Sequence, residues 1–112
     1  SATASKTIAS VATGSLGSLS AGTEGYGFGV TNITQGTGAG VTSAAVAYDA
    51  TASGGVNSSV GGLDATLRNI ASSTGTANGA VLTLKERAAI SASTPAASDY
   101  TDTLTIIGAG SF

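Results

Sequence analysis

Histidine, cysteine, methionine and tryptophan are absent from this chain of 112 residues. Without histidine and cysteine, the sequence excludes Ser-His-Asp and Cys-His nucleophiles, iron–sulfur clusters and histidine-based acid–base catalysis. Zinc sites are excluded for the same reason, because their usual ligands are thiolates and imidazoles. These absences remove most of the common catalytic and metal-binding chemistries.

Charged residues are scarce as well, at 9% of the chain, with four basic and six acidic side chains and a net charge of −2. Four basic residues cannot form a surface that follows a phosphate backbone, so nucleic acid is not an expected partner. No apolar run approaches the roughly 18 residues of a transmembrane helix, so no membrane span is expected.

The carboxylates are the one group of side chains that could carry acid–base chemistry. A glycosidase needs two of them across a cleft and usually aromatic platforms for the sugar, whereas the chain holds only 3 Tyr and 2 Phe. Asp99 and Asp102 fit turn and capping positions, and two carboxylates fall short of the roughly six to eight oxygens that calcium needs. We therefore expect no enzyme activity, and we predict no catalytic residue, no cofactor and no metal ligand.

Small residues dominate what is present: Ser, Thr, Ala and Gly occupy 71 of the 112 positions. Leu, Ile, Val and Phe total 22, close to the roughly 20% below which chains tend to be disordered. The single proline, the low charge and the mean hydropathy of +0.30 are nevertheless typical of a folded chain. The length predicts one domain over residues 1–112, and the composition suits an extracellular or cell-surface location.

Alternation of side chains predicts a strand over residues 25–30, in which Tyr26, Phe28 and Val30 share one face. The opposite face is bare because it carries Gly25, Gly27 and Gly29. Another backbone can approach such a face closely, so we expect a neighbouring strand or subunit to cover it. Residues 41–50 follow a glycine-rich turn and are expected to form a hairpin or a neighbouring strand with this segment.

The clearest pattern lies in the C-terminal third. Even-numbered positions from 81 to 93 are apolar except for Glu86, which predicts a long strand with a bulge or a crossing between sheets at Glu86. A turn around Pro95 follows, and residues 100–107 alternate again, so the two segments are expected to form a hairpin. Tyr100 is expected to hydrogen-bond nearby backbone through its hydroxyl.

Between these segments, Leu63, Leu67 and Ile70 recur at helical spacing. They predict a short helical turn near residues 63–70, with Asp64 and Arg68 as an i,i+4 pair. The several short strands separated by turns predict an all-β fold, an antiparallel β-sandwich of the immunoglobulin-like or pilin-like type.

Residues 88–105, AAISASTPAASDYTDTLT, resemble the last hairpin of spore-coat-U-like and fimbrial β-sandwiches. In those proteins a strand, a Pro-containing turn, Tyr, Asp-Thr and a final strand follow in that order. Ala97 stands where they usually have glycine, and their cysteines are missing here. Segments that resemble residues 5–8 and 21–27 occur together with this ending in uncharacterised secreted surface proteins of very small bacteria. The resemblance implies a non-enzymatic surface or pilin-like β-sandwich.

We therefore expect a structural subunit of an extracellular filament, pilus or cell-surface layer, a homopolymer assembled through β-strand and edge contacts. Residues 1–12 are the expected donor or linker strand and residues 108–112 a flexible tail. An open alternative is that the N-terminal strand pairs within its own domain. The residues expected at the assembly interface are Thr7, Ala9, Val11, Gly25, Gly27, Gly29 and Phe112.

A second function remains open, namely an adhesin or carbohydrate-binding module whose partners are host or surface glycans. Sugar binding of this kind calls for exposed aromatic side chains, and Tyr26 and Tyr48 are the candidates to supply them.

Overall fold

The computed structural model of the chain describes residues 1–51 and 59–110. Its elements, in chain order, are β1 (Gly17–Ser18), β2 (Gly25–Thr34), β3 (Thr42–Ala44), the 3-10 helix η1 (Val46–Tyr48), β4 (Ser59–Val60), β5 (Ala71–Ser73) and β6 (Val81–Ala89). The strands pair antiparallel as three two-stranded sheets, β1 with β4, β2 with β6, and β3 with β5. The expected all-β class is confirmed, and the sheets are small and open.

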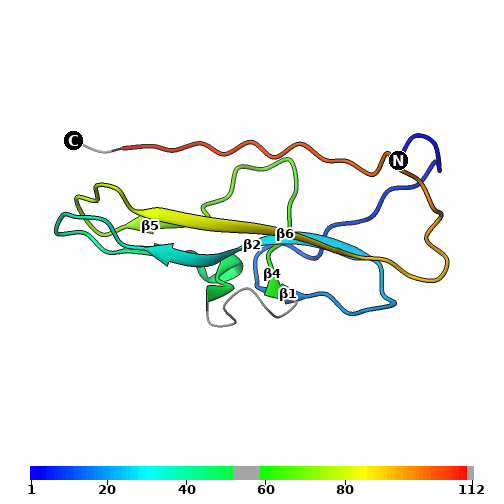
Figure 1. Cartoon of the computed structure of the whole chain (residues 1–112), viewed down its shortest axis with the longest axis horizontal. Helices are drawn as coiled ribbons and strands as arrows, with labels where there is room; N and C mark the ends of the chain where they lie inside the picture. Colours follow the sequence, from blue (N-terminus) through cyan, green and yellow to red (C-terminus); the bar gives the residue numbers. More distant parts are fainter. Residues whose placement is uncertain (52–58, 111–112) are drawn as a thin grey trace.

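The ribbon of β2 and β6 runs along the long axis of the molecule (Figure 1). Paired residues share a face of the ribbon, and the apolar face carries the pairs Tyr26–Ala88, Phe28–Glu86, Val30–Leu84 and Ile33–Leu82. The register shifts between Val30 and Asn32, where Thr31 is the extra residue of a bulge. This bulge returns Ile33 to the same face as Val30. The bulge predicted at Glu86 is therefore wrong, since β6 pairs without a break and the bulge lies in β2.

The partner predicted for residues 25–30 is also wrong. Residues 41–50 form only β3 and η1, and a single parallel bridge between Val30 and Asp49 connects this segment to β2. The chain turns at η1, where the Tyr48 N–H donates to the Ala45 carbonyl at 2.9 Å. That turn places the Tyr48 ring 5.2 Å from the Phe28 ring, between centroids, and leaves Tyr48 only 3% exposed. Burial of the Tyr48 ring thus favours a turn at η1 over a continuous strand through residues 41–50.

The hairpin predicted between residues 81–93 and 100–107 does not form: β6 pairs with β2, and residues 100–107 join neither edge of that ribbon. Residues 101–110 belong to no strand and follow the ribbon as a separate segment, drawn in orange and red in Figure 1. The expectation for Tyr100 is confirmed, since its hydroxyl donates to the Pro95 carbonyl at 2.8 Å.

The helical turn predicted near residues 63–70 is wrong as well, because only bends occur there. The Asp64 carboxylate accepts the Thr66 N–H at 3.0 Å, a local turn that competes with helix formation. So short a span also gains too few hydrogen bonds to offset helix nucleation. The Asp64–Arg68 pair forms nonetheless, with the Arg68 Nε 3.1 Å from Asp64 Oδ1.

The core is small and lies where β2, η1 and β4 meet. Its members are at most 4% exposed and comprise Phe28, Val30, Tyr48, Ala50 and Val60. The molecule is elongated, with extents of 50 × 25 × 23 Å. Its radius of gyration is 15.8 Å, whereas a compact domain of this length has one of about 13 Å. The fold therefore leaves much of its surface uncovered.

Candidate functional site

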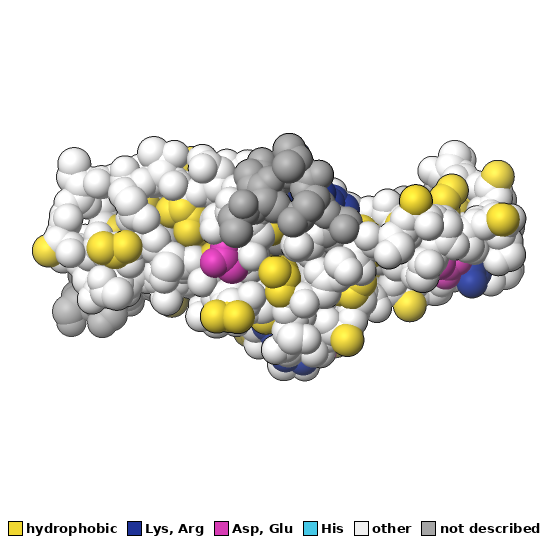
Figure 2. Space-filling model, turned by 90° about the horizontal axis from the view of Figure 1, so that it is seen from below, with side chains coloured by type: hydrophobic (Ala, Val, Ile, Leu, Met, Phe, Trp, Pro, Cys, Tyr) yellow, Lys and Arg dark blue, Asp and Glu magenta, His cyan; other side chains and the backbone are white. Residues whose placement is uncertain are grey.

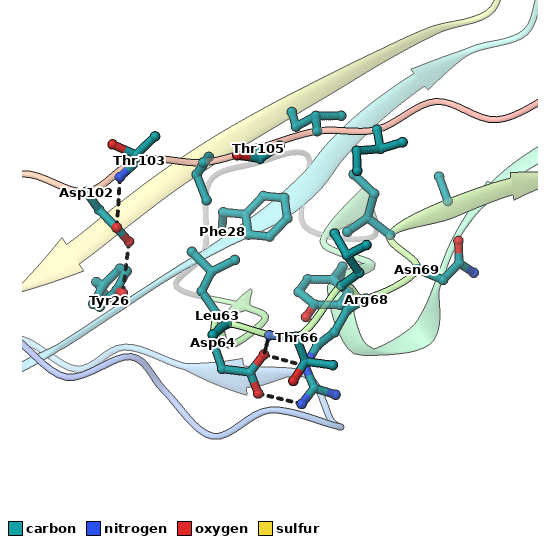
Figure 3. A pocket seen from close by; sticks show the side chains of 18 residues that line it. Tyr26, Phe28, Leu63, Asp64, Thr66, Arg68, Asn69, Asp102, Thr103 and Thr105 are labelled. Carbon is teal, nitrogen blue, oxygen red and sulfur yellow. Dashed lines mark hydrogen bonds and ion pairs between the residues drawn. The ribbon is translucent and has the colours of Figure 1, made fainter.

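A cavity of about 830 Å³ lies between the apolar face of β2, the loop before β5 and the C-terminal segment (Figure 3). We call it the trough, and its lining consists of Tyr26, Phe28, Tyr48, residues 63–71 and residues 102–107. Phe28 projects into it from β2, while Leu63 and Arg68 face it from the loop. The trough is thus built largely from segments that join no strand.

We call residues 103–110 the C-terminal arm; its residues 103–107 form one wall of the trough, and all residues of the arm are exposed to solvent. From Leu104 to Gly110 the arm makes no hydrogen bond with any residue that the structure describes. Its large apolar residues are left open, with Ile106 62% and Ile107 65% exposed. Leu67, on the facing loop, is 75% exposed. The arm and the loop therefore present apolar side chains that neither one covers.

The arm is anchored at its start by Asp102. Tyr26 donates its hydroxyl to Asp102 Oδ2 at 3.0 Å, and Asp102 Oδ1 accepts the Thr103 N–H at 2.8 Å (Figure 3). Burial raises the pKa of the Tyr26 phenol, and the neighbouring Asp102 carboxylate raises it further. Tyr26 therefore stays protonated and remains a donor to Asp102 at neutral pH.

The Asp64–Arg68 pair occupies the opposite wall. Hydrogen bonds from Arg68 lower the pKa of the Asp64 carboxyl, and the Thr66 N–H lowers it further. The same contact raises the pKa of Arg68. An ionised carboxylate that accepts hydrogen bonds from a guanidinium is a poor general acid. Asp64 and Asp102 thus accept hydrogen bonds on the two walls of the trough.

The residues expected to donate a strand lie within the chain's own fold. Tyr26 donates its N–H to the Ala9 carbonyl at 3.2 Å, and the Val11 N–H donates to the Tyr26 carbonyl at 2.8 Å. Ser10 forms a parallel bridge with Tyr26, so this segment lies along the edge of β2. Thr7 lines a smaller hollow beside Tyr26 and β6. Here the N-terminal segment pairs within its own domain, and its exchange between copies stays a prediction.

The N-terminus is also fastened to the turn that precedes the arm. Lys6 Nζ lies 3.2 Å from Glu24 Oε1, and Glu24 Oε2 accepts the Thr94 hydroxyl at 2.8 Å. The Thr94 hydrogen bond lowers the pKa of the Glu24 carboxyl, and Lys6 lowers it by a smaller amount. Asp99 accepts the Ser1 hydroxyl and, at 2.9 Å, the Thr3 N–H; the first of these hydrogen bonds lowers the pKa of the Asp99 carboxyl most, and the second lowers it further. These contacts hold the chain in place up to the point where the arm begins.

The face formed by Gly25, Gly27 and Gly29 is buried, as expected, and segments of the same chain cover it. A Cβ at Gly27 would lie 2.5 Å from the Gly61 carbonyl oxygen, and a Cβ at Gly29 would lie 3.1 Å from the Ala50 Cβ. The bare face therefore admits β4 and the residues next to it. A role of these glycines between copies stays a prediction, and Phe112 lies outside the described residues.

Sequence reasoning missed the trough, although its signals are present. The helical spacing of Leu63, Leu67 and Ile70 marked an apolar surface, but the surface belongs to an irregular loop that lines the trough.

Lys85, Glu86 and Arg87 on β6 are typical of a strand at a sheet edge, where charged side chains discourage further pairing. Within the ladders that the structure describes, β2 is the only strand paired with β6.

Neither a metal-ligand cluster nor a membrane-spanning helix is present in the part of the chain that the structure describes. In residues 1–51 and 59–110, no cluster of three or more His, Cys, Asp or Glu could hold a metal ion. Across the same part of the chain, no helix has the length and apolar character needed to cross a bilayer. No protein family, no curated protein and no solved structure matches the chain.

Proposed function

We propose that this chain is a structural subunit of an extracellular filament, pilus or cell-surface layer, and that its copies assemble through β-strand and edge contacts. The proposal rests on the large solvent-exposed area of the chain. The chain exposes 7011 Å², whereas a folded monomer of 10.5 kDa exposes roughly 5,400 Å². The excess is about 1,600 Å², the area that one subunit contributes to two contacts of about 800 Å² each.

Two contacts per subunit are what a linear polymer needs, because each copy then binds one neighbour at each end. The surface has the composition that such contacts favour. It has few charged side chains, and hydrophobic side chains are spread along the long face (Figure 2). In this proposal, the antiparallel β-sandwich expected from the sequence is completed between copies, since the sheets of one copy are only two-stranded.

The alternative function, an adhesin or carbohydrate-binding module, has less support. It calls for exposed aromatic side chains, but Tyr48 is 3% exposed and donates its hydroxyl to the Gly62 carbonyl at 2.8 Å. Tyr26 is half-buried, and its hydroxyl is engaged by Asp102. The Tyr48 ring is therefore not accessible to a sugar, and Tyr26 exposes only part of its ring.

Sedimentation velocity over a concentration series, together with electron microscopy of the purified full chain, tests the proposal. We expect particles whose mass rises with protein concentration and which appear as rods, filaments or sheets. A single 10.5 kDa species at every concentration would overturn the proposal. Binding to a glycan array by that single species would favour the adhesin alternative instead.

A further inference from the structure

We propose that the C-terminal arm of one copy seats in the trough of a second copy, so that the arm is the exchanged segment of the assembly. This inference rests on the proposed function and names the contact that joins the subunits. The occupant is the arm of an identical chain, and the receiving surface consists of Phe28, Leu63, Leu67 and Ile70.

Complementarity between arm and trough is visible within one chain. Leu104, Ile106 and Ile107 line the same cavity as Phe28 and the apolar residues of the loop (Figure 3). An identical arm from another copy can make the same contacts, which is why exchange of an element between identical chains costs little.

The arm is nevertheless poorly held by its own chain. A cavity of about 830 Å³ remains between arm and body, and no hydrogen bond joins the described residues from Leu104 onward to the body. The backbone N–H groups of Leu67, Arg68 and Asn69, on the facing wall, also lack hydrogen bonds with the described chain. Both walls of the trough therefore offer backbone groups that could pair as strands.

The point of attachment explains why one chain leaves these groups unpaired. Asp99 is bound to the N-terminus and Asp102 to Tyr26, so the direction of the arm is fixed before Thr103. An arm that arrives from a second copy is anchored on its own chain and not beside this trough, so it can approach Phe28 and the loop from another direction. Eight extended residues span about 26 Å, which is enough to lie along the trough of a neighbour.

The absence of cysteine allows a direct test by site-specific cross-linking in the full chain. The variants Leu67→Cys and Ile106→Cys are prepared separately, mixed and treated with a short bismaleimide. Exchange predicts a covalent heterodimer of the two variants. Val46→Cys replaces Leu67→Cys as the matched control, because Val46 is 85% exposed but lies outside the trough.

The double variant Leu67→Cys/Ile106→Cys distinguishes exchange from an arm that stays on its own chain. Exchange predicts a ladder of cross-linked oligomers, whereas an arm that stays in the trough of its own chain gives an internally cross-linked monomer. A monomer band alone, with no heterodimer above the Val46→Cys control, would overturn the proposal.

A second pair of variants measures the contribution of the arm to assembly. Ile106 and Ile90 are 62% and 60% exposed, but only Ile106 belongs to the arm. We expect Ile106→Asp to raise the concentration needed for assembly by about tenfold or more, and Ile90→Asp to leave it unchanged. Circular dichroism checks that both variants keep the fold.

The outcomes for the wild type separate the two proposals. If the wild type assembles but Ile106→Asp assembles equally well and no heterodimer forms, the exchange is refuted while the structural role stands. If the wild type remains a monomer at every concentration, the structural role itself fails.

Discussion

Replacement of Gly27 by alanine should separate β4 from β2. The new Cβ would lie 2.5 Å from the Gly61 carbonyl oxygen and 2.9 Å from Val60 Cγ2, so either the backbone of β4 or that of β2 must move. Two hydrogen bonds cross this contact. The Phe28 N–H donates to the Gly61 carbonyl at 3.1 Å, and the Gly61 N–H donates to the Phe28 carbonyl at 2.7 Å.

The cost follows from these contacts. Overpacking of a tight interior contact costs roughly 1–3 kcal/mol, and each lost hydrogen bond adds about 1 kcal/mol. The lower entropy of the unfolded alanine chain offsets about 0.5 kcal/mol of this. We therefore expect Gly27→Ala to lower the free energy of unfolding by about 2.5–4.5 kcal/mol, a large part of the total for a small domain.

Urea titration followed by far-UV circular dichroism and tyrosine fluorescence measures this change, since the chain has no tryptophan. Gly75→Ala is the matched control, because the nearest atom to its new Cβ is the Gly40 Cα at 3.4 Å, an ordinary contact. The control should stay within about 0.5 kcal/mol of the wild type. A Gly27→Ala variant as stable as the control would refute the assignment of Gly27 as the site where β4 approaches β2.

Two further predictions concern a buried hydroxyl and the carboxylates. Tyr48→Phe keeps the ring contact with Phe28 but removes the donor to the Gly62 carbonyl, so urea titration should show a loss of about 1–2 kcal/mol; no loss would mean that water satisfies this carbonyl. The carboxyl pKa values of Glu24, Asp64 and Asp99 are lowered in the folded chain from ordinary values of 4.5, 3.8 and 3.8. The three ionised carboxylates therefore stabilise the folded chain at pH values above their ordinary pKa, and this stabilisation is lost as the pH falls through their lower pKa values in the folded chain. The Tm should be flat from pH 7 to about 5 and fall below about pH 4. A Tm that is constant down to pH 2 would contradict this.

Local pattern alone predicted several features of this protein. The alternation over residues 25–30 predicted the strand at β2, and its three glycines predicted a face that another segment covers closely. The alternation from residue 81 predicted β6, and the i,i+4 spacing predicted the Asp64–Arg68 pair. Each of these depends on residues that are neighbours in the sequence, and side-chain periodicity reports such relations directly.

The tertiary structure decided which strand pairs with which. Alternation shows the face that a strand buries but not its partner, and the partner of β6 is β2 rather than residues 100–107. The bulge at Thr31 arises only in that pairing, because it keeps Ile33 in line with Leu82. The tertiary structure likewise decided the role of Leu63, Leu67 and Ile70, which line the trough opposite the arm instead of forming a helix. Pairing, register and the trough all depend on contacts between residues far apart in the chain, where the free energy of packing outweighs local preference.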